Sequence, residues 1–242
     1  MMRPYRNIGF FFLMLSLLVV AGFTPRIPGT PFFGYFSQVT QPAAIPWAIH
    51  WHAFSALAWF ALLTIQPFLI RANRPDLHRL LGRASIVVAA LFVYTAFQAV
   101  KLFYTQGIAQ MPRDTVLSLL AQSFTALTLF LVFFTLALLN RRKLHRHVAF
   151  MVAASLAAAE PGLARLGLYV VGGLPGILVM VAVIYTTLIG FLLYAKFRLQ
   201  QPVLRSPYLP IMALFLVAHA IDFVGSRTPT WRWFADMIVS TW

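Results

Sequence analysis

The sequence predicts an all-α integral membrane protein with seven transmembrane helices, and three observations lead to this fold class. The 242 residues are 61% hydrophobic and 10% charged, with a mean hydropathy of +0.81, whereas a soluble domain is about a quarter charged. Apolar runs long enough to cross a bilayer recur seven times along the chain. None of these runs alternates apolar and polar residues with a period of two, so they are helices rather than strands.

The predicted spans form a single polytopic domain over residues 1–242. In chain order they cover residues 8–23, 47–70, 83–103, 115–139, 148–171, 176–195 and 208–224. The first span follows Arg3 and Arg6, as the apolar stretch of a signal peptide does, but no clear small-x-small cleavage site comes after it. We therefore expect the first helix to be retained as an anchor.

The chain ends in a predicted interfacial tail, residues 226–242. At helical spacing, four apolar side chains fall on one face of this tail: Trp231, Phe234, Ile238 and Trp242. Such a face is expected of a helix that lies on the membrane surface.

The basic residues predict the orientation of the spans. The 19 Lys and Arg against 5 Asp and Glu give a formal net charge of +14, an excess that often indicates a polyanionic partner. With seven spans, however, 13 of the 19 fall on one side, within residues 3–6, 71–83, 141–146 and 196–205. The positive-inside rule then places the N-terminus in the cytoplasm and the C-terminus outside. Basic residues at these helix ends bind anionic lipid headgroups on the cytoplasmic face, which excludes nucleic acid as the partner.

An internal repeat relates the second and third spans to the fourth and fifth. Residues 52–60 resemble residues 122–130, with His52 matched by Gln122, and the triplet Leu-His-Arg at 77–79 recurs at 144–146. Parallel repeats of this kind predict a pseudo-repeated four-helix core made of these four spans.

The two Leu-His-Arg triplets suggest a cofactor site on the cytoplasmic rim. His78 and His145 fall near the starts of two core helices, and a small residue follows each of them one turn later. Two histidines on facing helices suit the axial ligation of a haem b, with Arg79, Gly82 and Arg83 completing the candidate site. Since the outer repeat position offers only one histidine, one haem is expected rather than two. The alternative is that the triplets cap their helices and contact phosphates and carbonyls.

A second candidate site lies in the outer half of the predicted membrane domain. His52, Glu160, His219 and Asp222 are ionisable residues within or at the edge of spans, where charge is costly and functional roles are common. His219 and Asp222 share a helical face, and with the other two they offer ligands for a metal such as Zn²⁺ or groups for a proton relay. The alternative is structural: Arg165 is neutralised by Glu160 or Asp222.

Residues 66–71 read Gln-Pro-Phe-Leu-Ile-Arg, and residues 77–83 read Leu-His-Arg-Leu-Leu-Gly-Arg. Over about residues 47–170 the chain resembles a family of predicted bacterial membrane proteins of unknown function. That family has a histidine opening a helix, a Gln near the inner end of this helix, and then His-Arg-x-x-Gly-Arg. The pattern corresponds here to His52, Gln66, His78, Arg79, Gly82 and Arg83, and its later basic residues to His145, Arg146 and Arg165. The resemblance implies a multi-pass protein of the bacterial inner membrane and supplies no activity.

Composition and motifs narrow the classes of function. The absence of Cys excludes disulfides, iron–sulfur clusters, thiolate metal sites and covalently attached haem. The sequence contains no nucleotide-binding loop, Gly-x-Ser-x-Gly elbow or His-Glu-x-x-His motif. Three hypotheses remain: a haem b protein that exchanges electrons with a quinone, a transporter or metal-dependent membrane enzyme that uses the outer cluster, and a non-catalytic subunit of a larger membrane complex.

Overall fold

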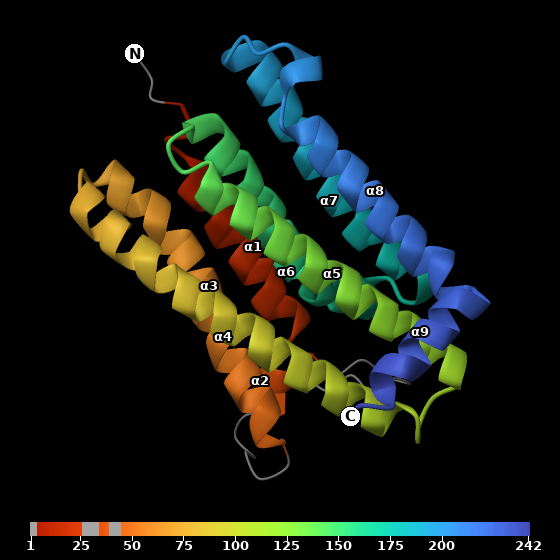
Figure 1. The fold of residues 1–242 in the computed structure, drawn as a ribbon. Coiled ribbons are helices and arrows are strands. Elements are labelled where there is room, and N and C mark those ends of the chain that lie inside the picture. The colour runs from red at the N-terminus through yellow and green to blue at the C-terminus, as the bar shows by residue number, and fades with distance from the viewer. Residues whose placement is uncertain (1–3, 26–33, 39–44) are drawn as a thin grey trace. The chain divides into compact units, whose positions relative to one another are not determined.

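The computed structural model describes residues 4–25, 34–38 and 45–242. These residues are almost entirely helical (Figure 1). Six of the described helices are long and apolar enough to cross a membrane, and a seventh apolar helix, α1 (Ile8–Gly22), has 15 residues. The chain is therefore a multi-pass helical protein of the membrane type. Arg3 and Arg26, which contribute to the charge count, lie outside the described residues.

The chain divides into two compact units, and three helices contribute to both. The first unit contains residues 1–103 and 162–176, and the second contains residues 104–161 and 177–242. The two halves of the internal repeat consequently fall mainly in different units, so the four-helix core remains a prediction.

The first unit is built around α1, α3 (Trp47–Arg71) and most of α4 (Pro75–Gly107), with the short helix α2 (Tyr35–Gln38) before α3. Figure 1 shows α3 and α4 as a helical hairpin. Helix α1 packs along α3, where the Ser16 and Thr64 hydroxyl oxygens lie 3.2 Å apart.

The part of α6 (Leu144–Val170) in the first unit packs through glycines. A Cβ atom on Gly22 would overlap the carbonyl oxygen of Gly162, and one on Gly167 would overlap that of Gly176. Glycine is thus required at these places by close approach of two backbones.

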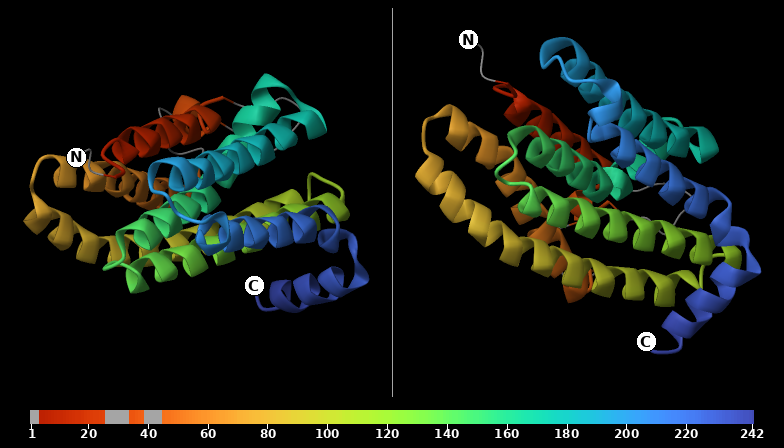
Figure 2. Two further views of the ribbon diagram at one scale, coloured as in Figure 1. Left: turned by 90° about the horizontal axis from the view of Figure 1, so that it is seen from above. Right: turned by 45° about the horizontal axis from the view of Figure 1, so that its top comes forward.

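The second unit contains α5 (Arg113–Leu139), the first part of α6, most of α7 (Gly173–Arg198), α8 (Tyr208–Phe223) and α9 (Pro229–Val239). Helices α5 and α8 pack side by side, with the rings of Phe133 and Phe215 stacked 5.5 Å apart. A 3-10 turn at Gly225–Arg227 ends α8, and α9 then turns back towards α5 (Figure 2).

The predicted interfacial tail forms α9, and part of its apolar face contacts protein. Thr228 caps the helix by accepting from the Trp231 backbone N–H, and Pro229 opens the first turn, both common helix-start signals. The Trp231 indole N–H donates to the Leu117 carbonyl at 2.9 Å. Trp233 on α9 is 68% exposed, so apolar surface also remains for the membrane interface.

Each predicted span overlaps a described helix, with ends that differ by up to eight residues. The largest difference is α4, which begins at Pro75 rather than at residue 83. Asp76 therefore lies in the first turn and forms an ion pair with Arg74 at 3.5 Å. The hydropathy pattern marks the apolar part of a helix, whereas Pro and Asp mark its start.

Candidate functional site

A buried carboxyl group and a buried imidazole face each other in the second unit. Glu160 on α6 is 1% exposed and His219 on α8 is 6% exposed. Oε1 of Glu160 lies 3.9 Å from Nε2 of His219. Among the described residues, neither of these two atoms has a hydrogen-bond partner. Polar atoms buried without partners are costly, so this pair calls for an explanation beyond packing.

The helix that carries Glu160 brings it into a tightly packed region. Ala153, Ala157 and Ala159 on α6 are almost completely buried, and such small side chains allow neighbouring helices to approach closely. Pro161 follows Glu160 directly within the helix. A proline removes a backbone N–H donor and commonly bends a helix.

Tyr185 on α7 contacts Nδ1, the nitrogen of the His219 ring that does not face Glu160. Its hydroxyl oxygen lies 3.0 Å from Nδ1, and the two rings meet edge to face with centroids 5.6 Å apart. When the Tyr185 hydroxyl donates to Nδ1, the neutral imidazole carries its proton on Nε2. That N–H then points along the side on which Glu160 lies.

Asp222, one helical turn after His219 on α8, carries a second carboxyl group. Its Oδ1 accepts a hydrogen bond from the Thr125 hydroxyl of α5 at 2.8 Å, and its side chain is only partly buried. Asp222 and His219 share one face of α8, because they are three residues apart. Asp222 therefore belongs to the same polar cluster as the Glu160–His219 pair.

Polar side chains run along the interface between α5 and α8. On α5 they are Ser118, Gln122 and Thr125, and on α8 and the turn after it they are His219, Asp222 and Ser226. Each set keeps the spacing of three and four residues that places side chains on one helical face. The Ser226 and Ser118 hydroxyl oxygens are 3.3 Å apart, and Nε2 of Gln122 lies 3.9 Å from Sδ of Met180.

Aromatic rings surround the histidine of this cluster. Phe215 and Phe223 lie on α8 one turn before and one turn after His219, with ring centroids 6.1 Å and 6.4 Å from the imidazole. Apolar rings keep the local dielectric constant low and so strengthen the interactions among the polar groups.

His52 belongs to the first unit and has a different set of neighbours. Its Nδ1 lies 3.4 Å from the Thr95 hydroxyl, which is 2.7 Å from the Ser55 hydroxyl, and its ring stacks on Phe92. No three His, Asp or Glu side chains among the described residues are grouped as a metal ion would require. Because His52 and the other three residues are described in separate units, the four-residue metal set remains a prediction.

His50 lies nearly opposite His52 on α3 and contacts the short helix α2. The Tyr35 hydroxyl oxygen is 3.0 Å from Nδ1 of His50, and burial raises the pKa of Tyr35. The two histidines therefore lie in different surroundings, as expected for residues two apart on a helix, which point in nearly opposite directions.

Arg165 also lies in the first unit. Its guanidinium sits over the Phe23 ring, 4.7 Å from the ring centroid. The ion-pair partner that the structure gives to Glu160 is His219. A cation over an aromatic face is a recognised way to accommodate a buried Arg.

The rim residue His78 is tied to the preceding helix through Gln66. Nδ1 of His78 lies 3.3 Å from the Gln66 backbone carbonyl. In the orientation of the Gln66 amide that satisfies both its polar atoms, its oxygen accepts from the Gly82 N–H at 2.8 Å and its nitrogen donates to the His78 carbonyl. Gln66, His78 and Gly82 of the sequence pattern are therefore neighbours, whereas Arg79 and Arg83 are exposed.

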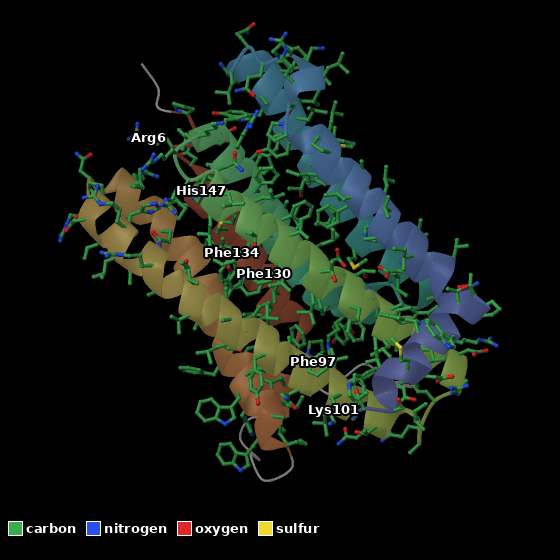
Figure 3. The ribbon with its side chains drawn as sticks, in the orientation of Figure 1. Arg6, Phe97, Lys101, Phe130, Phe134 and His147 are labelled. Carbon is green, nitrogen blue, oxygen red and sulfur yellow. The ribbon has the colours of Figure 1, made fainter. Side chains whose placement is uncertain are left out.

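The second rim histidine lies in the other unit. The His145 ring meets the Tyr208 ring edge to face at 5.9 Å. Nearby on α6, His147 (labelled with Phe130 and Phe134 in Figure 3) has its Nδ1 2.9 Å from the Ala137 carbonyl oxygen. Because His78 and His145 are described in separate units, their pairing about a haem remains a prediction.

The sequence interpretation missed two members of the buried cluster, Thr125 and Tyr185. Hydroxyl residues are common in transmembrane helices, so neither stands out alone. The detectable signal was the spacing of Ser118, Gln122 and Thr125, a polar stripe on an otherwise apolar helix. No family model, curated protein or solved structure matches this chain.

Proposed function

We propose that this multi-pass membrane protein is a proton-coupled transporter in which Glu160 and His219 form the proton-binding pair. The observation that carries the proposal is that their facing atoms are 3.9 Å apart, buried, and without hydrogen-bond partners among the described residues. Intramembrane carboxyl and imidazole groups are typical of proton relays in transporters.

The physical argument rests on the cost of buried charge. A lone carboxylate in this region is strongly disfavoured, so Glu160 is stable either as a neutral acid or beside a protonated His219. One proton can reside on either group, and a small movement of the helices changes which arrangement is favoured. A site of this kind couples proton binding to conformation.

In this proposal an ion gradient supplies the energy for transport. The chain has no nucleotide-binding loop, so an ion gradient is the natural driving force. The proposal favours the transporter hypothesis because a buried carboxyl group facing a buried imidazole is the arrangement that a proton relay uses.

Infrared spectroscopy of the purified protein in liposomes tests the proton-binding pair. We expect a carboxylic acid band that titrates between about pH 4 and pH 9, and that disappears in Glu160→Gln. Asp236→Asn is the matched control, since Asp236 is an exposed carboxylate paired with Arg113. A spectrum without a titrating band that depends on Glu160 would contradict the proposal.

Proton flux in the same liposomes tests transport itself. A potassium diffusion potential should drive proton movement reported by a trapped pH dye, and Glu160→Gln should abolish it. If the flux is equal in the wild type, in Glu160→Gln and in empty liposomes, the Glu160–His219 pair does not transport protons, and the proposed function is wrong.

Haem b bound by His78 and His145, with a quinone or a larger membrane complex as partner, stays a second prediction. In support of this prediction, Gln66 contacts His78 through its backbone carbonyl and its side-chain amide, which holds the histidine beside the preceding helix. Protein purified from haem-supplemented cells should then show a Soret band that His78→Ala removes. A colourless preparation would refute it.

A further inference from the structure

Polar side chains continue from the buried pair towards the end of α8, along one face of that helix. Glu160 is 1% exposed, whereas Asp222 is partly exposed and lies in the last turn of α8. Beyond Asp222, the Ser226 hydroxyl donates to the backbone carbonyl of Asp222 at 2.6 Å, and its oxygen lies 3.3 Å from that of the Ser118 hydroxyl. Within this run, Asp222 is therefore the carboxyl group that solvent protons can reach first.

Thr125 can serve Asp222 in both of its protonation states. The Thr125 hydroxyl oxygen is 2.8 Å from Oδ1 of Asp222 and 3.0 Å from the backbone carbonyl of Gln122. When Asp222 is ionised, the hydroxyl donates to the carboxylate. When Asp222 is protonated, its O–H can donate to Thr125, whose own proton turns to the Gln122 carbonyl. Asp222 thus gains or loses a proton while keeping its partner.

We infer that Asp222 and Thr125 form the proton-uptake site of the Glu160–His219 pair. Asp222 is the carboxyl group that exchanges protons with solvent, and Thr125 is the positioning residue. This inference rests on the proposed function. In the transfer step, the O–H bond of neutral Asp222 breaks and an O–H bond forms on ionised Glu160, so one carboxylate replaces another and the net charge is unchanged.

The charged groups at this end of the second unit leave Asp222 available for this role. Arg113 forms an ion pair with Asp236, and Arg232 forms one with Asp114. Among the described residues, no basic side chain is ion-paired with Asp222. An ion pair would hold a carboxylate in its charged form and oppose proton exchange.

The polar groups around Asp222 and the Glu160–His219 pair come from four helices, α5, α6, α7 and α8, and from the turn after α8. They are Thr125 and Gln122 on α5, Glu160 on α6, Tyr185 on α7, His219 on α8 and Ser226 in the turn after it. Of these, Glu160 and His219 are the carboxyl and imidazole groups, whereas the hydroxyl and amide groups do not titrate near neutral pH.

A pH jump followed by time-resolved infrared spectroscopy tests the inference. It measures the rate at which the Glu160 carboxylic acid band appears, separately from the final size of the band. We expect Thr125→Val to slow the rate about tenfold or more, and Thr125→Ser to restore it, because serine keeps the hydroxyl. Asp222→Asn should slow the rate as well, because an amide cannot deliver a proton to Glu160.

Ser155→Ala is the matched control. Ser155 is a buried hydroxyl on α6 that donates within its own helix, to the Val152 carbonyl at 2.8 Å, so its removal should leave the rate unchanged. Wild-type rates in both Thr125→Val and Asp222→Asn would overturn the inference while the equilibrium band still supports the proposed function. If the wild type lacks the band altogether, the proposed function itself fails. If Thr125→Val does not fold, Thr125→Ala and Asp222→Asn decide the question by the same rate.

Discussion

At the scale of single residues, the cluster is defined by polar atoms placed where water is excluded. Oε1 of Glu160 and Nε2 of His219 face each other without hydrogen bonds in the described part of the chain. The sequence predicted that Glu160, His219 and Asp222 belong together, because two share a helical face and all are ionisable within spans. It could not predict Tyr185 or Thr125, since a hydroxyl on an apolar helix is ambiguous until its neighbour is known.

Removing the Tyr185 hydroxyl tests how the His219 ring is held. Tyr185→Phe leaves Nδ1 of His219 buried without the partner that lies 3.0 Å away, so the free energy of unfolding should fall by about 1–3 kcal/mol. Thermal unfolding in detergent measures this loss. Tyr169→Phe is the control, because Tyr169 is 55% exposed. Equal stability of the two variants would show that the Tyr185 contact contributes nothing.

At the scale of the helices, hydropathy located the apolar segments but missed the first turns of α4. The 33 residues of α4 extend about 50 Å at the usual rise per residue, which exceeds the hydrocarbon thickness of about 30 Å. Its first two turns contain the polar residues Asp76, His78 and Arg79. A hydropathy window excludes such turns, although they continue the same hydrogen-bonded helix.

The close packing of α1 on α6 through glycine gives a prediction at this scale. In Gly22→Ala the new methyl group overlaps the Gly162 carbonyl oxygen, a backbone atom that cannot rotate away. We expect a loss of about 2–3 kcal/mol in stability, measured by thermal unfolding.

Gly190→Ala on α7 is the matched control for that substitution. A Cβ on Gly190 meets no atom within 4 Å, so alanine there should be neutral or stabilising by up to about 1 kcal/mol. A Gly22→Ala variant as stable as Gly190→Ala would mean that α1 does not approach α6 so closely.

At the scale of the whole molecule, the number of spans decides the side on which each terminus lies. Six described helices are long and apolar enough to cross. Helix α1, with 15 residues, extends about 23 Å, short of the hydrocarbon thickness of about 30 Å. The positive-inside rule predicts that the basic segments between the later spans face the cytoplasm whether or not α1 crosses, so only the predicted location of the N-terminus depends on this helix.

Single cysteines introduced into this cysteine-free chain test the orientation. An impermeant maleimide added to intact cells should label Ser240→Cys and should label Arg142→Cys only after permeabilisation, since the positive-inside rule puts Arg142 in the cytoplasm. Both positions are exposed. The reverse pattern would contradict the predicted orientation. A tag before α1, found inside or outside, then establishes whether that helix crosses.

The sequence by itself determined the class of the protein and the course of its helices. The length of the apolar runs indicates a bilayer, the placement of charge indicates an orientation, and the scarcity of carboxyl groups draws attention to a few residues. All three are local properties of the sequence. Tertiary structure decided which of those residues meet. Glu160 and His219, about 60 positions apart on α6 and α8, face each other, with Tyr185 and Thr125 beside the cluster, whereas His52 has separate neighbours. Helix packing fixes such contacts through side-chain shape over the entire interface, and no short stretch of sequence contains that information.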